Sequence, residues 1–271
     1  MVLIDTHCHL FSSEYADLPG VLHRARGKGV VAAVAPGVSP ATNLRLLELA
    51  RAHPGAVWPC FGFHPEHLFL TEEDFQMVCA QVREHRAALV GLGEVGLPHY
   101  SLADTPDVKA TAEAGRRRLR HLLGLAAELD LAVTLHAPHE AAAETFGLLR
   151  EAGVARAVFH WHKAPEETTR RILEAGYLIS VTPEVCYRER DRQLVKEAPL
   201  DRLLLESDGP WPYEGEFSGM TTEPWMVALA AQAVARIKGV AVGEVADQTT
   251  RNAARLFGLD LSRLPAPRGG R

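Results

Sequence analysis

Short runs of apolar and β-branched residues alternate along the chain with longer segments in which apolar residues recur every three or four positions. An apolar run of about four to eight residues is typical of a buried strand, and the longer spacing is typical of an amphipathic helix. The sequence therefore predicts eight strands, at residues 2–5, 30–35, 56–63, 88–95, 131–136, 156–161, 177–182 and 202–207.

The segments between these runs predict helices. They include residues 43–53, 74–85, 116–129 and 140–153, followed after the last strand by an eighth barrel helix at 222–239 and a short closing helix at 249–258. Alternation of strands and helices is typical of βαβ units around a parallel sheet. It fits a (β/α)8 barrel and also an open doubly wound sheet, so the count of elements leaves both α/β folds open.

Length and composition indicate one domain. The 271 residues are close to the roughly 250 residues of a (β/α)8 barrel, and no linker rich in Gly, Ser or Pro divides the chain. We therefore predict a single domain over residues 1–262. Residues 263–271 are rich in Pro, Gly and Arg, and we expect them to form a disordered C-terminal tail.

The formal net charge of −5 argues against a protein that coats long nucleic acid by releasing its counterions. An enzyme that grips a single strand end is still compatible with this charge, because it needs only local positive charge and bound metal ions can supply part of it.

The cysteines and the N-terminus bear on location. The four cysteines contain no C-x-x-C pair, which predicts reduced thiols and no disulfide framework. The chain begins without a basic segment or a long apolar one, and no apolar stretch reaches the ~18 residues of a membrane span. We expect a cytoplasmic protein with no membrane association and no obligate protein partner.

Metal-binding residue types gather at the ends of the predicted strands, and this decides between the two sheets. In a barrel, the carboxyl ends of all strands meet at one rim, whereas an open sheet would scatter several of these residues. The pattern therefore favours a (β/α)8 barrel. The residues at the strand ends are His7, His9, His64, Glu94, His136, His160, His162 and Asp208.

His7 and His9 flank Cys8 at the end of the first predicted strand. Because side chains alternate along an extended chain, both imidazoles project the same way. The alternative is a surface turn with incidental histidines.

Glu94 interrupts an apolar, Gly-rich strand end, where a lone carboxylate is costly to bury. A buried arginine could compensate it, but a carboxylate shared by two metal ions about 3.5–4 Å apart explains the position better.

His136 and His160 each end an apolar strand. A single such histidine is often structural, but histidines and carboxylates from separate strands are together what a catalytic metal site requires. Asp208 follows the last strand, where it can bind a metal and act as the general base toward an activated water. The Ser-Asp-Gly-Pro sequence also fits an ordinary turn aspartate.

These residues stand in motifs whose order resembles that of the TatD family of metal-dependent deoxyribonucleases, within the amidohydrolase-like barrels. The resemblance covers nearly the whole chain. Its motifs are Asp5-Thr6-His7-Cys8-His9-Leu10, Gly62-Phe63-His64-Pro65, Gly93-Glu94-Val95-Gly96-Leu97, His136, Phe159-His160, Glu206-Ser207-Asp208-Gly209-Pro210 and Asn252-Ala253-Ala254-Arg255-Leu256-Phe257-Gly258.

The resemblance implies a hydrolase that cleaves phosphodiester bonds in DNA with metal-activated water, and we expect exonuclease action at 3′ ends. It implies two divalent ions, which the mixed ligands predict to be Zn, Mn or Mg. It also implies that Asp208 and Glu94 are catalytic, that His64 contacts the scissile phosphate and that Glu206 orients substrate or water. The ligands would be His7, His9, Glu94 and Asp208 for one ion, and Glu94, His136 and His160 for the other.

The chain departs from the family pattern around the ligands. It has Gly96-Leu97-Pro98 for Gly-Leu-Asp, His136-Ala137-Pro138 for His-Ser-Arg, and His160-Trp161-His162-Lys163-Ala164 for His-Cys-Phe-Ser-Gly. We expect His162 and Lys163 to line the substrate site, with Lys163 replacing the missing arginine as the phosphate contact. Lys163 could instead be an exposed helix start, and Arg188 and Arg190 are a rival source of charge that reads more simply as a solvated helix face.

These departures leave two alternatives to a DNA substrate. One is a barrel hydrolase of small esters, lactones, amides or phosphoesters that uses the same metals. The other is a scaffold or binding protein with an inactive centre, which the six intact candidate ligands disfavour.

Overall fold

The computed structural model describes residues 1–267 of the chain. A short 3-10 helix, Leu261–Arg263, ends at the first residue of the predicted tail, and within that tail the carbonyl of Ala266 accepts a hydrogen bond from the Arg26 guanidinium (3.1 Å). The rest of that tail, residues 268–271, lies outside the described residues.

All eight predicted strands are present in one sheet, and they follow one another in sequence order from β1 to β8. Adjacent strands pair in parallel, as in β1–β2, β4–β5 and β7–β8. Consecutive parallel strands with intervening helices confirm the predicted (β/α)8 barrel fold. The strands are β1 Leu3–Asp5, β2 Val30–Pro36, β3 Val57–Phe61, β4 Gly91–Gly96, β5 Ala132–His136, β6 Ala157–Phe159, β7 Leu178–Val181 and β8 Leu203–Leu205.

The helices follow the strands in the predicted order, and α4 and α9 begin about two turns earlier than their apolar pattern indicates. Helix α4 starts at Val108 because the side chain of Asp107 caps it by accepting from the amide of Ala110 (2.9 Å). The closing helix α9 starts at Val242. The helices are α1 Leu18–Gly27, α2 Pro40–Ala52, α3 Glu72–Glu84, α4 Val108–Glu128, α5 Ala141–Glu151, α6 Glu166–Glu174, α7 Glu189–Glu197, α8 Val227–Lys238 and α9 Val242–Phe257.

Packing groups the chain into two compact units, and the single domain stays a prediction. Unit 1 consists of residues 1–35, 48–58 and the chain from Leu178 onward, and unit 2 consists of residues 36–47 and 59–177. Each unit carries candidate ligands of its own and is described in turn.

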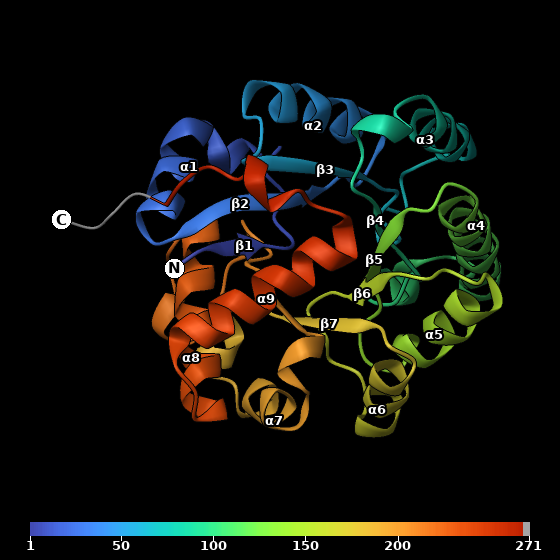
Figure 1. Cartoon of the computed structure of the whole chain (residues 1–271). Helices are drawn as coiled ribbons and strands as arrows, with labels where there is room; N and C mark the ends of the chain where they lie inside the picture. The colour runs from blue at the N-terminus through green and yellow to red at the C-terminus, as the bar shows by residue number, and fades with distance from the viewer. Residues whose placement is uncertain (268–271) are drawn as a thin grey trace. The chain divides into compact units, whose positions relative to one another are not determined.

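In unit 1, helix α9 packs against β1 and β8 (Figure 1). Its buried face includes Val245, Ala253 and Leu256. The side-chain amide of the buried Asn252 donates hydrogen bonds to the carbonyls of Leu200 (2.9 Å) and Leu203 (2.8 Å), where β8 begins. The asparagine of the C-terminal motif therefore holds the closing helix to the last strand.

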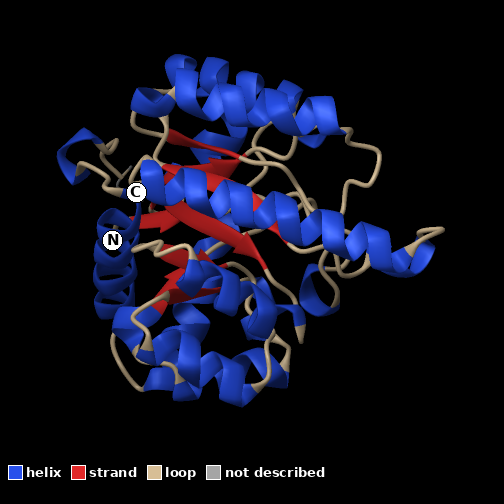
Figure 2. Cartoon of the chain, turned by 90° about the vertical axis from the view of Figure 1, so that its right-hand side faces the viewer, coloured by secondary structure: helices blue, strands red, loops and turns tan. Residues whose placement is uncertain are grey.

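In unit 2, helix α4 packs against β4 and β5, and Figure 2 shows helices covering the strands on this side of the molecule. Strand β4 approaches its neighbours very closely, and glycines make this possible. A Cβ atom on Gly93 would lie 2.7 Å from the Thr134 Cβ, and one on Gly96 would lie 2.0 Å from the His136 carbonyl oxygen. The glycines therefore allow the strand ends that carry Glu94 and His136 to lie side by side.

Candidate metal centre

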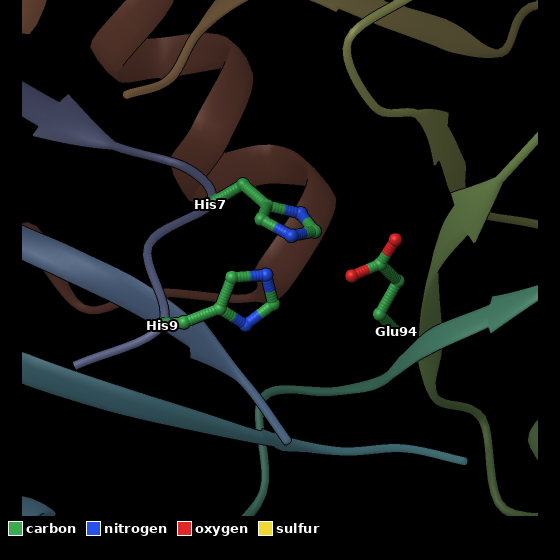
Figure 3. Close-up of side chains that lie close together, drawn as sticks. All are labelled: His7, His9 and Glu94. Atoms are coloured by element: carbon green, nitrogen blue, oxygen red, sulfur yellow. The ribbon is translucent and has the colours of Figure 1, made fainter. Parts of the chain in front are cut away.

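In unit 1, His7 and His9 follow β1 and alternate with a buried Cys8, as the sequence predicts. The Cys8 amide donates to the Val34 carbonyl (3.2 Å), and Cys8 also forms an isolated bridge with Gly209. Cys8 is therefore held in the packing, and both imidazoles project to the same side (Figure 3). Their ring centroids lie 5.0 Å apart.

Asp208 meets these two histidines within unit 1. Its Oδ1 lies 3.6 Å from Nε2 of His7 and 3.5 Å from Nε2 of His9. The backbone holds this arrangement, because the Asp208 amide donates to the His7 carbonyl (2.9 Å). Asp208 has a φ of 49°, a left-handed conformation that aspartate tolerates better than most residues.

Asp5 is a buried acidic residue for which the sequence predicts no role of its own. Its Oδ1 accepts from the amides of Ser207 (2.9 Å) and His7 (3.1 Å), and its Oδ2 accepts from the Ser207 hydroxyl (2.5 Å). Burial raises the pKa of Asp5 to about 8, although the Ser207 hydrogen bonds oppose this shift. Asp5 thus joins the segment that carries His7 to the one that carries Asp208. Its position at an apolar strand end, like that of Glu94, was the available sequence signal.

Glu206 belongs to the same unit and is also buried. Its Oε2 accepts from the Ser180 hydroxyl (2.6 Å), so β7 fixes this carboxylate. The predicted role of Glu206 in orienting substrate or water stays a prediction.

In unit 2, Glu94 brings three imidazoles together. Its side chain, which extends from β4 (Figure 3), is 1% exposed. Its Oε1 lies 2.8 Å from Nε2 of His160, 2.9 Å from Nδ1 of His136 and 3.1 Å from Nε2 of His64. The sequence predicts the association of Glu94 with His136 and His160. The equally close position of His64, expected only as a substrate contact, is an additional finding.

Backbone contacts explain why His64 lies near Glu94. The backbone amide of Gly62 donates to Oδ1 of the buried Asn43 (3.0 Å). The side-chain amide of Asn43 in turn donates to the Gly62 carbonyl (3.1 Å). The Phe63 amide donates to the Glu94 carbonyl (3.1 Å). The segment after β3 is therefore fixed beside β4.

The chemistry of these donors fits a divalent cation. Three imidazole nitrogens surround one buried carboxylate oxygen in unit 2, and His64, Glu94 and His136 offer ligand atoms within 4.8 Å of one another. Within unit 1, two imidazoles lie beside the carboxylate of Asp208. Mixed histidine and carboxylate sets of this kind suit Zn and Mn, and Mg less well.

Glu66 is a partly buried carboxylate for which the sequence predicts no role. It lies in the turn after β3, and its Oε1 is 3.1 Å from Nε2 of His136. Burial alone would raise the pKa of Glu66, but hydrogen bonds with His136 and Ser101 outweigh burial and lower it. For His136, burial would lower the pKa, but the contacts with Glu66 and Glu94 raise it. The carboxylate two residues after His64 was the only sequence signal.

His162 and Lys163 follow β6. His162 is buried, its Nε2 lies 2.8 Å from the Thr169 hydroxyl, and burial lowers its pKa to about 3. The Lys163 Nζ lies 3.3 Å from the centroid of the Trp161 ring, an attractive cation–π geometry. Their contact with substrate stays a prediction.

Arg188 is the N-cap residue of α7 and Arg190 lies in its first turn, and both guanidinium groups are paired with carboxylates. Arg188 contacts Glu214 (2.6 Å), and Arg190 contacts Glu184 and Asp191 (2.8 Å each). Both side chains are nearly half exposed, at 45% and 46%. This arrangement agrees with their interpretation as a solvated helix face.

Comparisons with known proteins agree with these motifs. The family model described as "TatD related DNase" matches residues 4–258. The human protein named "Deoxyribonuclease TATDN3" is 31% identical over 266 residues, which cover 94% of each chain. The Escherichia coli K12 protein named "Uncharacterized metal-dependent hydrolase YcfH" is 33% identical over 278 residues, covering 99% of this chain and 100% of its own.

Solved structures support the same relationship. The crystal structure of YJJV, a TatD homologue from Escherichia coli K12, superposes with a TM-score of 0.85 at 26% identity, covering 95% of this chain and 98% of that one.

Across residues 1–267, no single helix combines the length and apolar character needed to cross a membrane.

Proposed function

Because the chain belongs to the TatD-related DNase family, we propose that it is a metal-dependent hydrolase that cleaves phosphodiester bonds in DNA. The observation that carries this proposal is the cluster around Glu94, whose Oε1 lies within 3.1 Å of three imidazole nitrogens. Histidines and a carboxylate in such a buried cluster are the donors that a catalytic divalent ion requires.

The proposed metal ligands come from both units. One ion would be held by Glu94, His136 and His160, and a second by His7, His9 and Asp208, for which the family resemblance implies Glu94 as a further ligand. The donor chemistry favours Zn or Mn, with Mg as the third candidate. When bound, the ions would polarise a phosphoryl oxygen and lower the pKa of water.

Asp208 is the proposed general base. Its carboxylate lies among imidazoles that would be neutral as ligands, and it can accept the proton that an attacking water loses. His64 is proposed to contact the scissile phosphate, where its imidazolium or N–H would balance the developing negative charge. Lys163 and His162 are proposed to face the substrate beyond His160, and Glu206 to orient substrate or water.

The proposed substrate is a DNA 3′ end. The human relative's name as a deoxyribonuclease supports DNA, and the net charge of −5 suits an enzyme that grips one strand end better than one that coats a duplex. The second candidate is hydrolysis of small esters, lactones, amides or phosphoesters. The absence of the family arginine after His136, where Ala137-Pro138 stand, favours that candidate.

The test compares substrates on one metal-loaded preparation. Protein stripped of metal is reconstituted with Zn, Mn or Mg and given single-stranded DNA labelled at either end, together with small esters and phosphoesters. Stepwise release of nucleotides from the 3′ end supports the proposal. Hydrolysis of the small compounds without DNA cleavage replaces it by the second candidate, and inactivity with every metal overturns both.

A further inference from the structure

Glu66 touches His136 on the side opposite Glu94. We infer that it is a positioning residue that selects Nδ1 of His136 as the metal-binding nitrogen, an inference that rests on the proposed metal-dependent function. Nδ1 of His136 lies 2.9 Å from Oε1 of Glu94, while Nε2 lies 3.1 Å from Oε1 of Glu66. The imidazole is therefore placed between two carboxylates.

The chemistry of imidazole gives these two contacts different roles. A neutral imidazole carries one N–H and one lone pair, so only one of its nitrogens can bind a cation. If Nε2 carries the proton and donates it to Glu66, the lone pair is left on Nδ1, which faces Glu94. A carboxylate behind a metal-binding histidine fixes the ring orientation and tautomer and makes the coordinating nitrogen more basic.

Four hydrogen bonds from the loop after β4 hold Glu66 itself. Its Oε1 accepts from the amides of His99 (2.8 Å) and Tyr100 (3.1 Å), and its Oε2 accepts from the Ser101 amide (2.9 Å) and hydroxyl (2.6 Å). Hydrogen bonds to an ionised carboxylate are about twice as strong as neutral ones. The loop after β4 thus fixes the carboxylate that fixes His136.

The same contacts allow a purely structural role, in which Glu66 only clamps this loop. The two roles make different predictions, because Ser101 touches Glu66 and His136 touches it separately. Ser101→Ala removes one loop donor and leaves the His136 contact in place. Glu66→Ala removes the acceptor for the loop donors and for His136. Glu66→Gln retains an amide oxygen that can accept from Nε2 of His136.

The experiment measures metal binding without turnover. Dissociation constants for Zn²⁺ are obtained by chelator competition, and ¹¹³Cd–¹⁵N couplings in cadmium-loaded, ¹⁵N-histidine-labelled protein identify the bound nitrogen. We expect cadmium on Nδ1 of His136 in the wild type. Glu66→Ala should weaken binding about 10- to 100-fold, Glu66→Gln should weaken it less, and Ser101→Ala should leave it within about twofold.

Three results would overturn the inference: cadmium on Nε2 of His136, unchanged affinity in Glu66→Ala, or equal losses in Ser101→Ala and Glu66→Ala. If Glu66→Ala fails to fold by circular dichroism, the same couplings in Glu66→Gln decide. His136→Ala distinguishes a wrong ligand set from a wrong role for Glu66. If it does not weaken metal binding, the proposed ligand set fails; if it does and Glu66→Ala does not, only the role of Glu66 fails.

Discussion

Asp208 shows how much of the proposed chemistry depends on single side chains. It lies within 3.6 Å of His7 and His9 and is proposed to act both as a ligand and as the base. Asp208→Asn should lower kcat by about 10²- to 10⁴-fold, because an amide cannot accept the proton. Steady-state kinetics on metal-loaded protein checks this, with exposed Asp247→Asn as the control. Near-normal turnover in Asp208→Asn would rule out the base.

His64 separates substrate binding from metal binding. We expect His64→Ala to raise KM for phosphate substrates while leaving the metal content unchanged, because its partners in the proposed ligand sets stay in place. Metal analysis and kinetics on the same preparation test this, with exposed His23→Ala as the control. Since Nε2 of His64 is 3.1 Å from Oε1 of Glu94, loss of metal in His64→Ala would instead assign His64 as a ligand.

Lys163 tests the replacement of the family arginine. A lysine can bind phosphate as a point charge where a bidentate arginine is absent. Lys163→Ala should weaken DNA binding and reduce the slope of log affinity against log salt by about 1. Arg188→Ala is the matched control, because its guanidinium is paired with Glu214. Unchanged affinity and salt dependence in Lys163→Ala would refute the replacement.

At the scale of elements, the glycines of strand β4 allow it to pack closely against β5. A Cβ on Gly96 would lie 2.0 Å from the His136 carbonyl oxygen, so Gly96→Ala must displace backbone. We expect the free energy of unfolding to fall by about 1–3 kcal/mol, as in other overpacked sites. Gly124→Ala, in α4 with nothing within 4 Å of its Cβ, should raise it by up to about 1 kcal/mol. Urea denaturation of metal-free protein compares them, and equal effects would contradict this account.

Elements were more predictable than their ends. Apolar runs located each strand because burial of a parallel sheet on both faces leaves a continuous apolar signal. The start of α4 was missed because it depends on the capping side chain of Asp107 and on polar residues that carry no apolar period.

Some residues of the candidate site could be predicted from local sequence, and others could not. His7 and His9 could be paired from the alternation of side chains along a strand. Asp5 and Glu66 could not be assigned, because their roles depend on partners distant in sequence. Asp5 binds Ser207, 202 residues away, and Glu66 binds His136, 70 residues away.

For the whole molecule, bound metal should be a stabilising ligand. An ion that binds only the folded chain stabilises it by about 2.7 kcal/mol when its free concentration is 100 times its Kd. Removal of metal should therefore lower Tm, and added Zn or Mn should raise Tm with concentration. Differential scanning calorimetry of stripped and reconstituted protein measures this. The His136→Ala variant should respond less, and a Tm that is independent of metal in the wild type would exclude a structural contribution.

The positions of the ligands along the chain also set the order in which they become available during synthesis. The Glu94 cluster comes from one stretch of chain, since residues 59–177 of unit 2 are continuous. His7 and His9 are made first, but their carboxylate partner Asp208 follows about 200 residues later. A ribosome making about 5–20 residues per second therefore leaves the N-terminal histidines without Asp208 for at least several seconds. All residues of the Glu94 cluster are therefore synthesised before Asp208, the proposed base.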